Sequence, residues 1–263
     1  MFLTIYWIGI LLAIVSGIIN QIGTIMQKDI INQNLDNPKF MKSLIKSPKW
    51  VIGLIMKMII SGLFLYVIAQ LFIGPALISG LMSSGLIVLA IGSVKILGER
   101  LQSREMLGII LNIVGILFLS FSGVSLNIST YNFFEFNFIL RIIIFAVIFI
   151  LIIFLIILLN KRLGDSGVLL ALEAGLFYSY VTFWSSLISV SFGHLFNNSF
   201  QIIELSILIP SLALIGIFIT LATVYSQRTL KYGKANILVP LTGVPAKISS
   251  FILGKRQTEL EKI

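Results

Sequence analysis

The sequence predicts an all-α polytopic membrane protein. Of its 263 residues, 58% are hydrophobic and only 11% are charged, whereas about 25% of the residues of a soluble domain are charged. Several separate apolar runs reach about 18 residues or more, which is enough to cross a bilayer core of about 30 Å as a helix. A transmembrane β-barrel would require alternating polarity in segments of about 10 residues, and the sequence lacks that pattern.

Eight spans are predicted along the chain. They comprise residues 2–26, 51–73, 75–94, 106–124, 138–159, 167–193, 203–225 and 235–254. The first run has no basic segment before it and is longer than the apolar core of a signal peptide, so we expect it to stay in the protein as a span. The last run is interrupted by Pro240, Pro245 and Lys247.

Basic residues predict the orientation of these spans. The loops on one side of the predicted membrane carry 13 Lys and Arg residues, whereas the other side carries only Arg141 before the C-terminal tail. Cytoplasmic loops are enriched in Lys and Arg. The sequence therefore predicts a multi-pass protein of the cell membrane, with its N-terminus outside and the 27–50 loop in the cytoplasm. The net charge of +9 belongs to these loops, so we expect no nucleic-acid partner.

Two parts of the chain are similar to each other, in the same order of segments. The aligned pairs are LLAIVSGIIN (11–20) with LLALEAGLFY (169–178), Gln70 with Gln227, Gly74 with Gly233, Ala76 with Ala235, Ile78 with Ile237 and, after a gap, ILGER (96–100) with ILGKR (252–256). Shared hydrophobicity alone rarely produces three matched segments in one order, so the similarity predicts an internal repeat.

The repeat predicts a domain organisation. Residues 1–125 would form a first repeat of four spans, residues 126–160 a single connecting span, and residues 161–263 a second repeat of three spans. One intervening span inverts the second repeat relative to the first, an architecture that places a binding site near the bilayer midplane. The ILGER segment precedes another apolar run, whereas the chain ends soon after ILGKR, so the final helix of the second repeat is expected to be missing.

With these motifs the chain resembles the drug/metabolite transporter superfamily, which includes EamA-type permeases and small multidrug resistance proteins. The superfamily motif G-E/Q-R-L, followed by G-x-x-L-x-x-x-G, is carried by Gly98, Glu99, Arg100, Leu101, Gly108, Leu111 and Gly115. A second span that begins with tryptophan and the order of the spans resemble the NIPA-like magnesium transporter branch. The resemblance implies a transporter with inverted repeats, here C-terminally short.

The chain departs from these relatives at two charged positions. Small multidrug resistance proteins carry A-E-x-x-G in their first span, and that Glu binds protons and cationic drugs. The matching stretch 13–17 has no carboxylate, and Glu173 lies one residue beyond the equivalent place in the second repeat, about 100° around a helix. The NIPA-like branch typically has an acidic residue near the position of Lys57, which argues against a divalent-cation substrate.

Glu173, Lys57 and Lys247 are charged residues within predicted spans and so are candidates for a substrate or coupling-ion site. A carboxylate within the membrane is costly unless it is paired or hydrated, so Glu173 either exchanges a proton or cation during transport or pairs with a basic residue such as Lys247. Lys57 lies about 10 Å from the end of its span by helix rise and either contacts substrate or extends to the headgroups.

Uncharged polar and aromatic residues form a second group of candidates. Asn20, Gln21 and Gln70 either bind substrate or hydrogen-bond between helices, and the second role is the commoner one in membranes. Tyr180 and Trp184 follow Glu173 at helical spacing and form either one wall of a substrate cavity or ordinary core.

The remaining conspicuous residues are interpreted as structural. Glu99 and Arg100 are expected to form an ion pair at a span end, and His194 is a lone histidine expected in an outward loop. We find no nucleophile–base pair, metal-ligand cluster or nucleotide-binding fingerprint. The sequence therefore predicts no enzyme, no cofactor and no metal site.

The expected function is a secondary permease for a small organic metabolite, working by alternating access at a midplane site. A NIPA-like transporter of divalent cations such as magnesium is one alternative, and a non-transporting accessory or truncated subunit is another. The expected partners are membrane lipid and a small-molecule or ion substrate. A homodimer or a partner helix would cover the incomplete second repeat.

Overall fold

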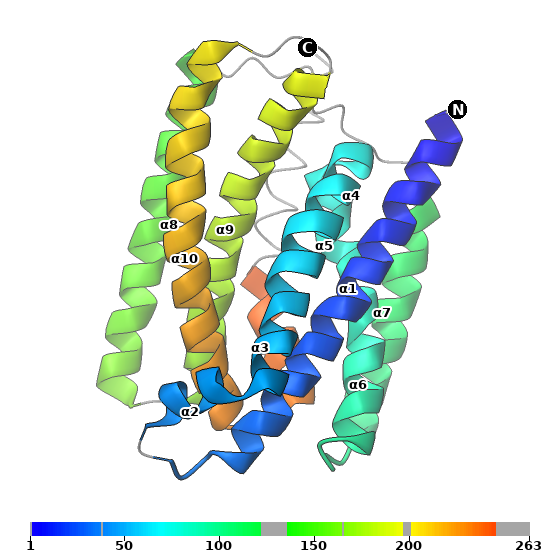
Figure 1. The fold of residues 1–263 in the computed structure, drawn as a ribbon, viewed down its shortest axis with the longest axis vertical. Helices are drawn as coiled ribbons and strands as arrows, with labels where there is room; N and C mark the ends of the chain where they lie inside the picture. Colours follow the sequence, from blue (N-terminus) through cyan, green and yellow to red (C-terminus); the bar gives the residue numbers. More distant parts are fainter. Residues whose placement is uncertain (1, 38, 122–135, 165, 197–200, 246–263) are drawn as a thin grey trace. The chain divides into compact units, whose positions relative to one another are not determined.

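The computed structural model describes residues 2–37, 39–121, 136–164, 166–196 and 201–245, and within these ranges all regular secondary structure is helical (Figure 1). Five of the described helices are long and apolar enough to cross a membrane: Ile5–Gln33, Pro48–Ile73, Ile143–Arg162, Gly167–Leu195 and Leu205–Lys231. The prediction of an all-helical, membrane-embedded chain is therefore confirmed at this level.

The three other predicted spans have different counterparts. The stretch expected as a span at 75–94 consists of α5 (Pro75–Leu81), the short 3-10 helix η2 (Met82–Ser84) and α6 (Gly85–Lys95). The stretch at 106–124 lies mostly in α7 (Ser103–Phe121). The last span is represented by the short helix Ala235–Pro245, and its remaining residues lie outside the described ranges.

The chain divides into two compact units. Unit 1 comprises residues 1–125 and 230–240, and unit 2 comprises residues 126–229 and 241–263. The C-terminal part of the chain thus contributes a short segment to each unit, residues 230–240 to unit 1 and residues 241–263 to unit 2. The boundary between these two segments falls within the helix Ala235–Pro245.

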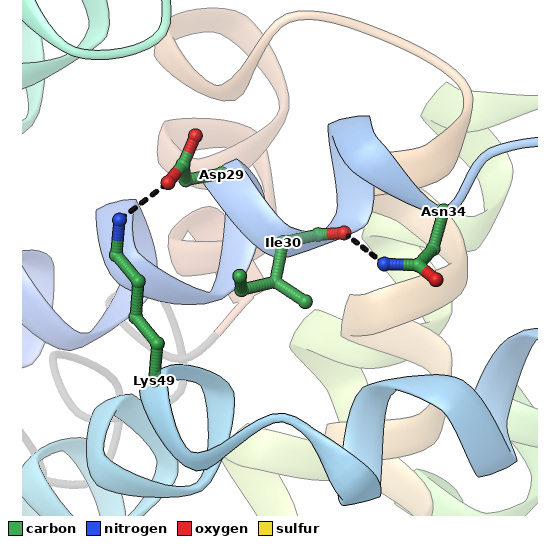
Figure 2. Close-up of polar contacts among 4 residues, drawn as sticks. All are labelled: Asp29, Ile30, Asn34 and Lys49. Atoms are coloured by element: carbon green, nitrogen blue, oxygen red, sulfur yellow. Dashed lines mark hydrogen bonds and ion pairs between the residues drawn. The ribbon is translucent and has the colours of Figure 1, made fainter.

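Unit 1 is organised around α1 (Phe2–Gln33), which contacts most of its other helices. One neighbour is the long span built from α3 (Pro48–Ile55), the π-helix η1 (Met56–Leu65) and α4 (Tyr66–Ile73). α5 and α6 are also neighbours of α1 (Figure 1). At its far end α1 is joined to α3 by an ion pair between Asp29 and Lys49 (Figure 2).

Glycines allow the helices of unit 1 to approach α1 closely. A Cβ atom placed on Gly17 would lie 2.2 Å from the backbone oxygen of Met82, and one placed on Gly85 would lie 2.1 Å from that of Gly17. Gly23 and Gly53 form a second such crossing, with corresponding distances of 2.5 and 2.7 Å. Close approach through small residues is the usual mode of helix packing in membranes.

Polar side chains add hydrogen bonds to this close packing. The Ser16 hydroxyl on α1 lies 3.0 Å from the Ser61 hydroxyl on η1, and Ser61 Oγ donates to the backbone oxygen of Ser16 at 2.9 Å. Both serines are fully buried. Their bonds hold the π-helical segment against α1. Wide helical turns of this kind occur frequently at functional sites.

Unit 2 contains three long helices: α8 (Phe136–Leu163), α9 (Gly167–Phe196) and α10 (Leu205–Lys231), whose last two residues belong to unit 1. They run alternately up and down, side by side (Figure 1). Their core is aromatic: ring centroids of Tyr180 and Phe218 lie 4.2 Å apart, and those of Phe145 and Phe183 lie 4.5 Å apart.

Long apolar side chains cover the outer surface of both units. Leu151, Phe154 and Leu155 on α8 and Leu111 and Phe118 on α7 are each more than half exposed. Exposed apolar faces of this extent are rare on soluble monomers. They match helices that face lipid, which supports membrane embedding.

Candidate functional site

Glu173 is the buried carboxylate on which the candidate site depends. It lies on the second turn of α9 and is 1% exposed. The Asn160 carboxamide, near the end of α8, donates to Glu173 Oε2 at 3.3 Å. A short connection joins α8 to α9, so the two helices are antiparallel neighbours and the end of one lies beside the start of the other.

Small and apolar residues of α9 flank Glu173 and are tightly packed. Ala171, Ala174 and Leu170 beside it on α9 are almost fully buried. Gly175, two residues further, admits the C-terminal part of the chain: an added Cβ would lie 2.4 Å from the Thr242 backbone oxygen. Sequence reasoning predicted Glu173 but missed Asn160, which stands at the end of an apolar run beside Lys161 and so looked like part of a loop.

The aromatic candidates lie in the core of unit 2. Tyr180 is 2% exposed and packs against Phe218 and against Trp184, whose ring centroid is 5.9 Å away. Trp184 also contacts Phe183 at 5.4 Å, and among the described residues its indole nitrogen, although buried, has no hydrogen-bond acceptor. Tyr180 and Trp184 are thus about two and three turns along α9 from Glu173, and they belong to one aromatic cluster.

The other candidates lie in unit 1 or outside the described ranges. Gln70 on α4 is fully buried, whereas Asn20 and Gln21 on α1 are half-buried. Lys57 is half-buried in the π-helical segment η1. Lys247 lies outside the described residues, and so does its expected pairing with Glu173.

The sequence motif around Glu99 forms a polar junction within unit 1. Glu99 carboxylate oxygens accept hydrogen bonds from the backbone N–H groups of Ala235 at 2.7 Å and Asn236 at 3.3 Å. Glu99 thereby caps the N-terminus of the helix Ala235–Pro245, where a negative charge is favourable. We expected Glu99 to pair with Arg100; its bonds are instead to backbone, because two unsatisfied N–H groups face it.

Two further side chains complete this junction, and sequence reasoning missed both. The Lys28 ammonium on α1 donates to the backbone oxygens of Leu230 and, at 2.9 Å, Gly233. The Asn236 carboxamide donates to Glu105 at 2.9 Å. Lys28 follows an apolar run and precedes a lysine-rich loop, so the sequence offers no signal that it is 5% exposed.

The glycines of the same motif have unequal surroundings. Gly98 has a φ of +67°, which favours glycine in the turn after α6. Gly108 and Gly115 lie on α7, and an added Cβ at either would meet no atom within 4 Å. In the described residues these two glycines therefore mark an open helix face.

His194 is wrongly placed by the sequence interpretation. The residue lies within α9, which continues to Phe196, and it is buried. Its Nδ1 lies 3.0 Å from Glu204 Oε1, on the short 3-10 helix η4 (Ile202–Glu204) that precedes α10. The ten-residue separation gave no hint of this pair.

No group of three or more His, Cys, Asp or Glu side chains that could hold a metal ion occurs among the residues that were placed. Comparisons with protein-family models, curated proteins and solved structures give no match for this chain.

Proposed function

We propose that this chain is a secondary transporter of a small organic metabolite in the cell membrane, and that Glu173 carries the coupling proton. The observation that supports the proposal is a fully buried carboxylate, hydrogen-bonded by Asn160, within helices long and apolar enough to span a bilayer. Ionisable residues within spans are functional candidates by default, since they are costly to keep there.

The energetics of Glu173 suit a coupling residue. A buried ionised carboxylate is unfavourable unless protonated or matched by a cation, and the Asn160 carboxamide that donates to it carries no charge. Exposure of Glu173 to one aqueous side would release the proton, and its return to the buried state would require a proton or a cationic group of the substrate. The residue can thus link a change of conformation to a change of charge.

Inverted repeats are the second part of the proposal, and a recurring close contact supports them. Gly17 and Gly175 occupy the same position in the two aligned segments. In unit 1 the backbone oxygen of Met82 fills the space beside Gly17, and in unit 2 that of Thr242 fills the space beside Gly175. If the alignment of Ala76 with Ala235 is continued, Met82 aligns with the residue just before Thr242, so the two contacts differ by one position in the alignment.

The two repeats are also similar in the connection that comes before the helical segment in contact with each glycine. Gly74 ends α4 with a φ of +75° and α5 starts at Pro75, whereas Gly233 lies between α10 and the helix that starts at Ala235. The aligned Gln70 and Gln227, one turn before each connection, are both fully buried. Broken helices at matching places in two repeats are typical of transporter binding sites near the midplane.

The test is transport by purified protein in proteoliposomes that contain a pH-sensitive dye. A panel of anionic, cationic and neutral metabolites is added outside, with magnesium as a separate arm for the divalent-cation alternative. We expect one class of organic solute to change the internal pH, and Glu173→Gln to abolish that change. Asp36→Asn, which removes an acid from an exposed turn, serves as the matched control and should transport normally.

The outcomes distinguish the alternatives. Magnesium entry without organic flux would replace the metabolite permease by the divalent-cation transporter. Organic flux that is unchanged in Glu173→Gln would remove Glu173 from the mechanism. Absence of any flux, together with co-purification of a second polypeptide from the native host, would favour the accessory subunit.

A further inference from the structure

We propose that the short helix α2 (Phe40–Lys46) lies in the membrane interface and that its exposed lysines bind the phosphate groups of anionic lipids. Lys42 and Lys46, together with Lys39 at the N-cap, are called here the basic face of α2. The proposal goes beyond the proposed function, because it concerns the lipid around the chain and does not depend on what the chain transports.

One side of α2 is fixed to unit 1 by apolar contacts. Leu44 is fully buried in a core cluster that includes Ile31 on α1 and Trp50 on α3. Phe40 and Met41 pack against the same cluster. The helix is therefore held in place on its apolar side, and its other side presents a surface of fixed orientation.

The basic face lies on that other side. At about 100° per residue, Lys42 and Lys46 lie about 160° around the helix from Leu44, and both lysines are exposed, as is Lys39. Lys42 and Lys46 are four residues apart, so they are neighbours on the helix surface, where like charges destabilise a helix. An anion bound by both side chains would offset this repulsion.

Nearby acidic side chains do not neutralise the basic face. In the part of the chain that the structure describes, none of its three lysines has an ion-pair partner: Asp29 is paired with Lys49 (Figure 2), and Asp36 is exposed in the turn before α2. A fourth exposed cation, Lys231, lies close to the helix, with its Nζ 5.3 Å from the centroid of the Phe40 ring. The excess of positive charge favours an anionic partner.

Two observations favour a lipid over a soluble anion. The helix lies between the apolar segments Ile5–Gln33 and Pro48–Ile73, at the end where they are connected (Figure 1), and the boundary of a span is where headgroup phosphates lie. Ile45, between the buried side and the basic face, is 59% exposed. Interfacial helices typically place apolar side chains against acyl chains, while their lysines extend to the headgroups.

The test compares an anionic with a zwitterionic lipid. Full-length protein, washed free of lipid in detergent, is titrated with phosphatidylglycerol or with phosphatidylcholine, and the bound lipids are counted by native mass spectrometry. We expect tighter binding of phosphatidylglycerol. A variant that combines Lys39→Gln, Lys42→Gln and Lys46→Gln should bind this lipid about tenfold more weakly or worse, since each lysine near an anionic membrane surface contributes about a fivefold factor.

The matched control removes the same charge elsewhere. Lys95→Gln, Arg104→Gln and Lys161→Gln, combined in one chain, change three exposed positions on the side of the membrane predicted for α2, and this variant should retain the preference for phosphatidylglycerol. Ile45→Ser, which removes the exposed apolar group, should weaken binding of both lipids because it acts on the acyl chains.

Three outcomes would overturn the proposal. Equal binding of the two lipids by the unaltered protein would do so, and this result decides even if a variant does not fold. An equal loss in the two triple variants would show an effect of net charge and not of α2. Displacement of phosphatidylglycerol by an equal concentration of glycerol 3-phosphate would identify a soluble phosphate as the ligand. None of these measurements requires a transported solute, so failure of the transport proposal would not change their meaning.

Discussion

At the scale of single residues, several buried or half-buried polar groups of this protein are held by specific partners. Asn160 donates to Glu173, Lys28 donates to two backbone oxygens after α10, and Glu99 accepts from two N–H groups. Each of these groups is polar and sits beside apolar helices, where the loss of a partner leaves an unsatisfied atom away from water. Their effects on stability are therefore measurable one residue at a time.

The hydrogen bond between Asn160 and Glu173 gives the first prediction. Asn160→Leu retains the size of the side chain but removes the donor. The free energy of unfolding should therefore fall by about 0.6 kcal/mol, the average for hydrogen bonds between membrane helices, and by no more than about 1.7 kcal/mol, the largest such contribution. Detergent-induced unfolding followed by circular dichroism measures the change.

The matched control is Asn34→Leu. The Asn34 carboxamide donates to the backbone oxygen of Ile30 one turn earlier in α1, at the partly exposed end of the helix (Figure 2). This local bond should contribute less. Equal losses in the two variants would contradict a special role for the buried pair.

The cap provided by Glu99 gives the second prediction. Glu99→Ala removes the acceptor for the first N–H groups of the helix Ala235–Pro245, and loss of such a cap costs about 0.5–2 kcal/mol. Hydrogen exchange at residues 235–240 should accelerate accordingly. Arg100→Ala, at the neighbouring exposed position, should leave this exchange unchanged, and acceleration in both variants would indicate general loosening of the loop.

At the scale of elements, the packing of helices depends on glycines that no larger residue can replace. The backbone oxygen atoms that face Gly17 and Gly175 cannot rotate away as a side chain could. The helices must separate if a methyl group is added. Gly108 and Gly115 on α7 lack such neighbours, so the same residue type has opposite consequences in different helices.

Alanine substitutions test this contrast and form the third prediction. Gly17→Ala and Gly175→Ala should each destabilise by about 1–3 kcal/mol or more, as overpacked sites do. Gly108→Ala, on an open helix face, should be neutral or stabilising by about 0.5–1 kcal/mol, because alanine favours a helix. Thermal unfolding of all three variants in one detergent gives the comparison, and a fully stable Gly17→Ala protein would show that the crossing is not close.

At the scale of the whole molecule, the predicted orientation in the membrane is open to a simple test. The chain contains no cysteine, so a single introduced thiol reports one position. In intact cells Gln201→Cys should react with a membrane-impermeant maleimide, whereas Asp36→Cys should react only after permeabilisation. Both positions are exposed. The reverse pattern would place the lysine-rich 27–50 loop outside and contradict the charge-based orientation.

Part of this organisation was predictable from patterns along the chain. Apolar runs long enough to cross a membrane identify the five long helices, because helix formation in lipid depends mainly on local hydrophobicity and length. Glu173 was identifiable for the same reason, since one acid interrupts an apolar run. The division of the 75–94 stretch into α5, η2 and α6 was not predictable from the sequence. The 3-10 turn Met82–Ser84 lies where the chain packs against Gly17, and this contact depends on the tertiary structure.

The sequence by itself determined that the chain is helical, that its surface suits lipid and which acid lies within a span. Only the tertiary structure decided that Asn160 binds Glu173, that Glu99 caps a helix 136 residues later and that His194 meets Glu204. The physical reason is that the formation of an apolar helix in a membrane depends on the hydrophobicity of its own residues, which can be read along the chain. The partner of a polar side chain depends instead on which helix ends come together, and that is decided by the packing of the whole unit.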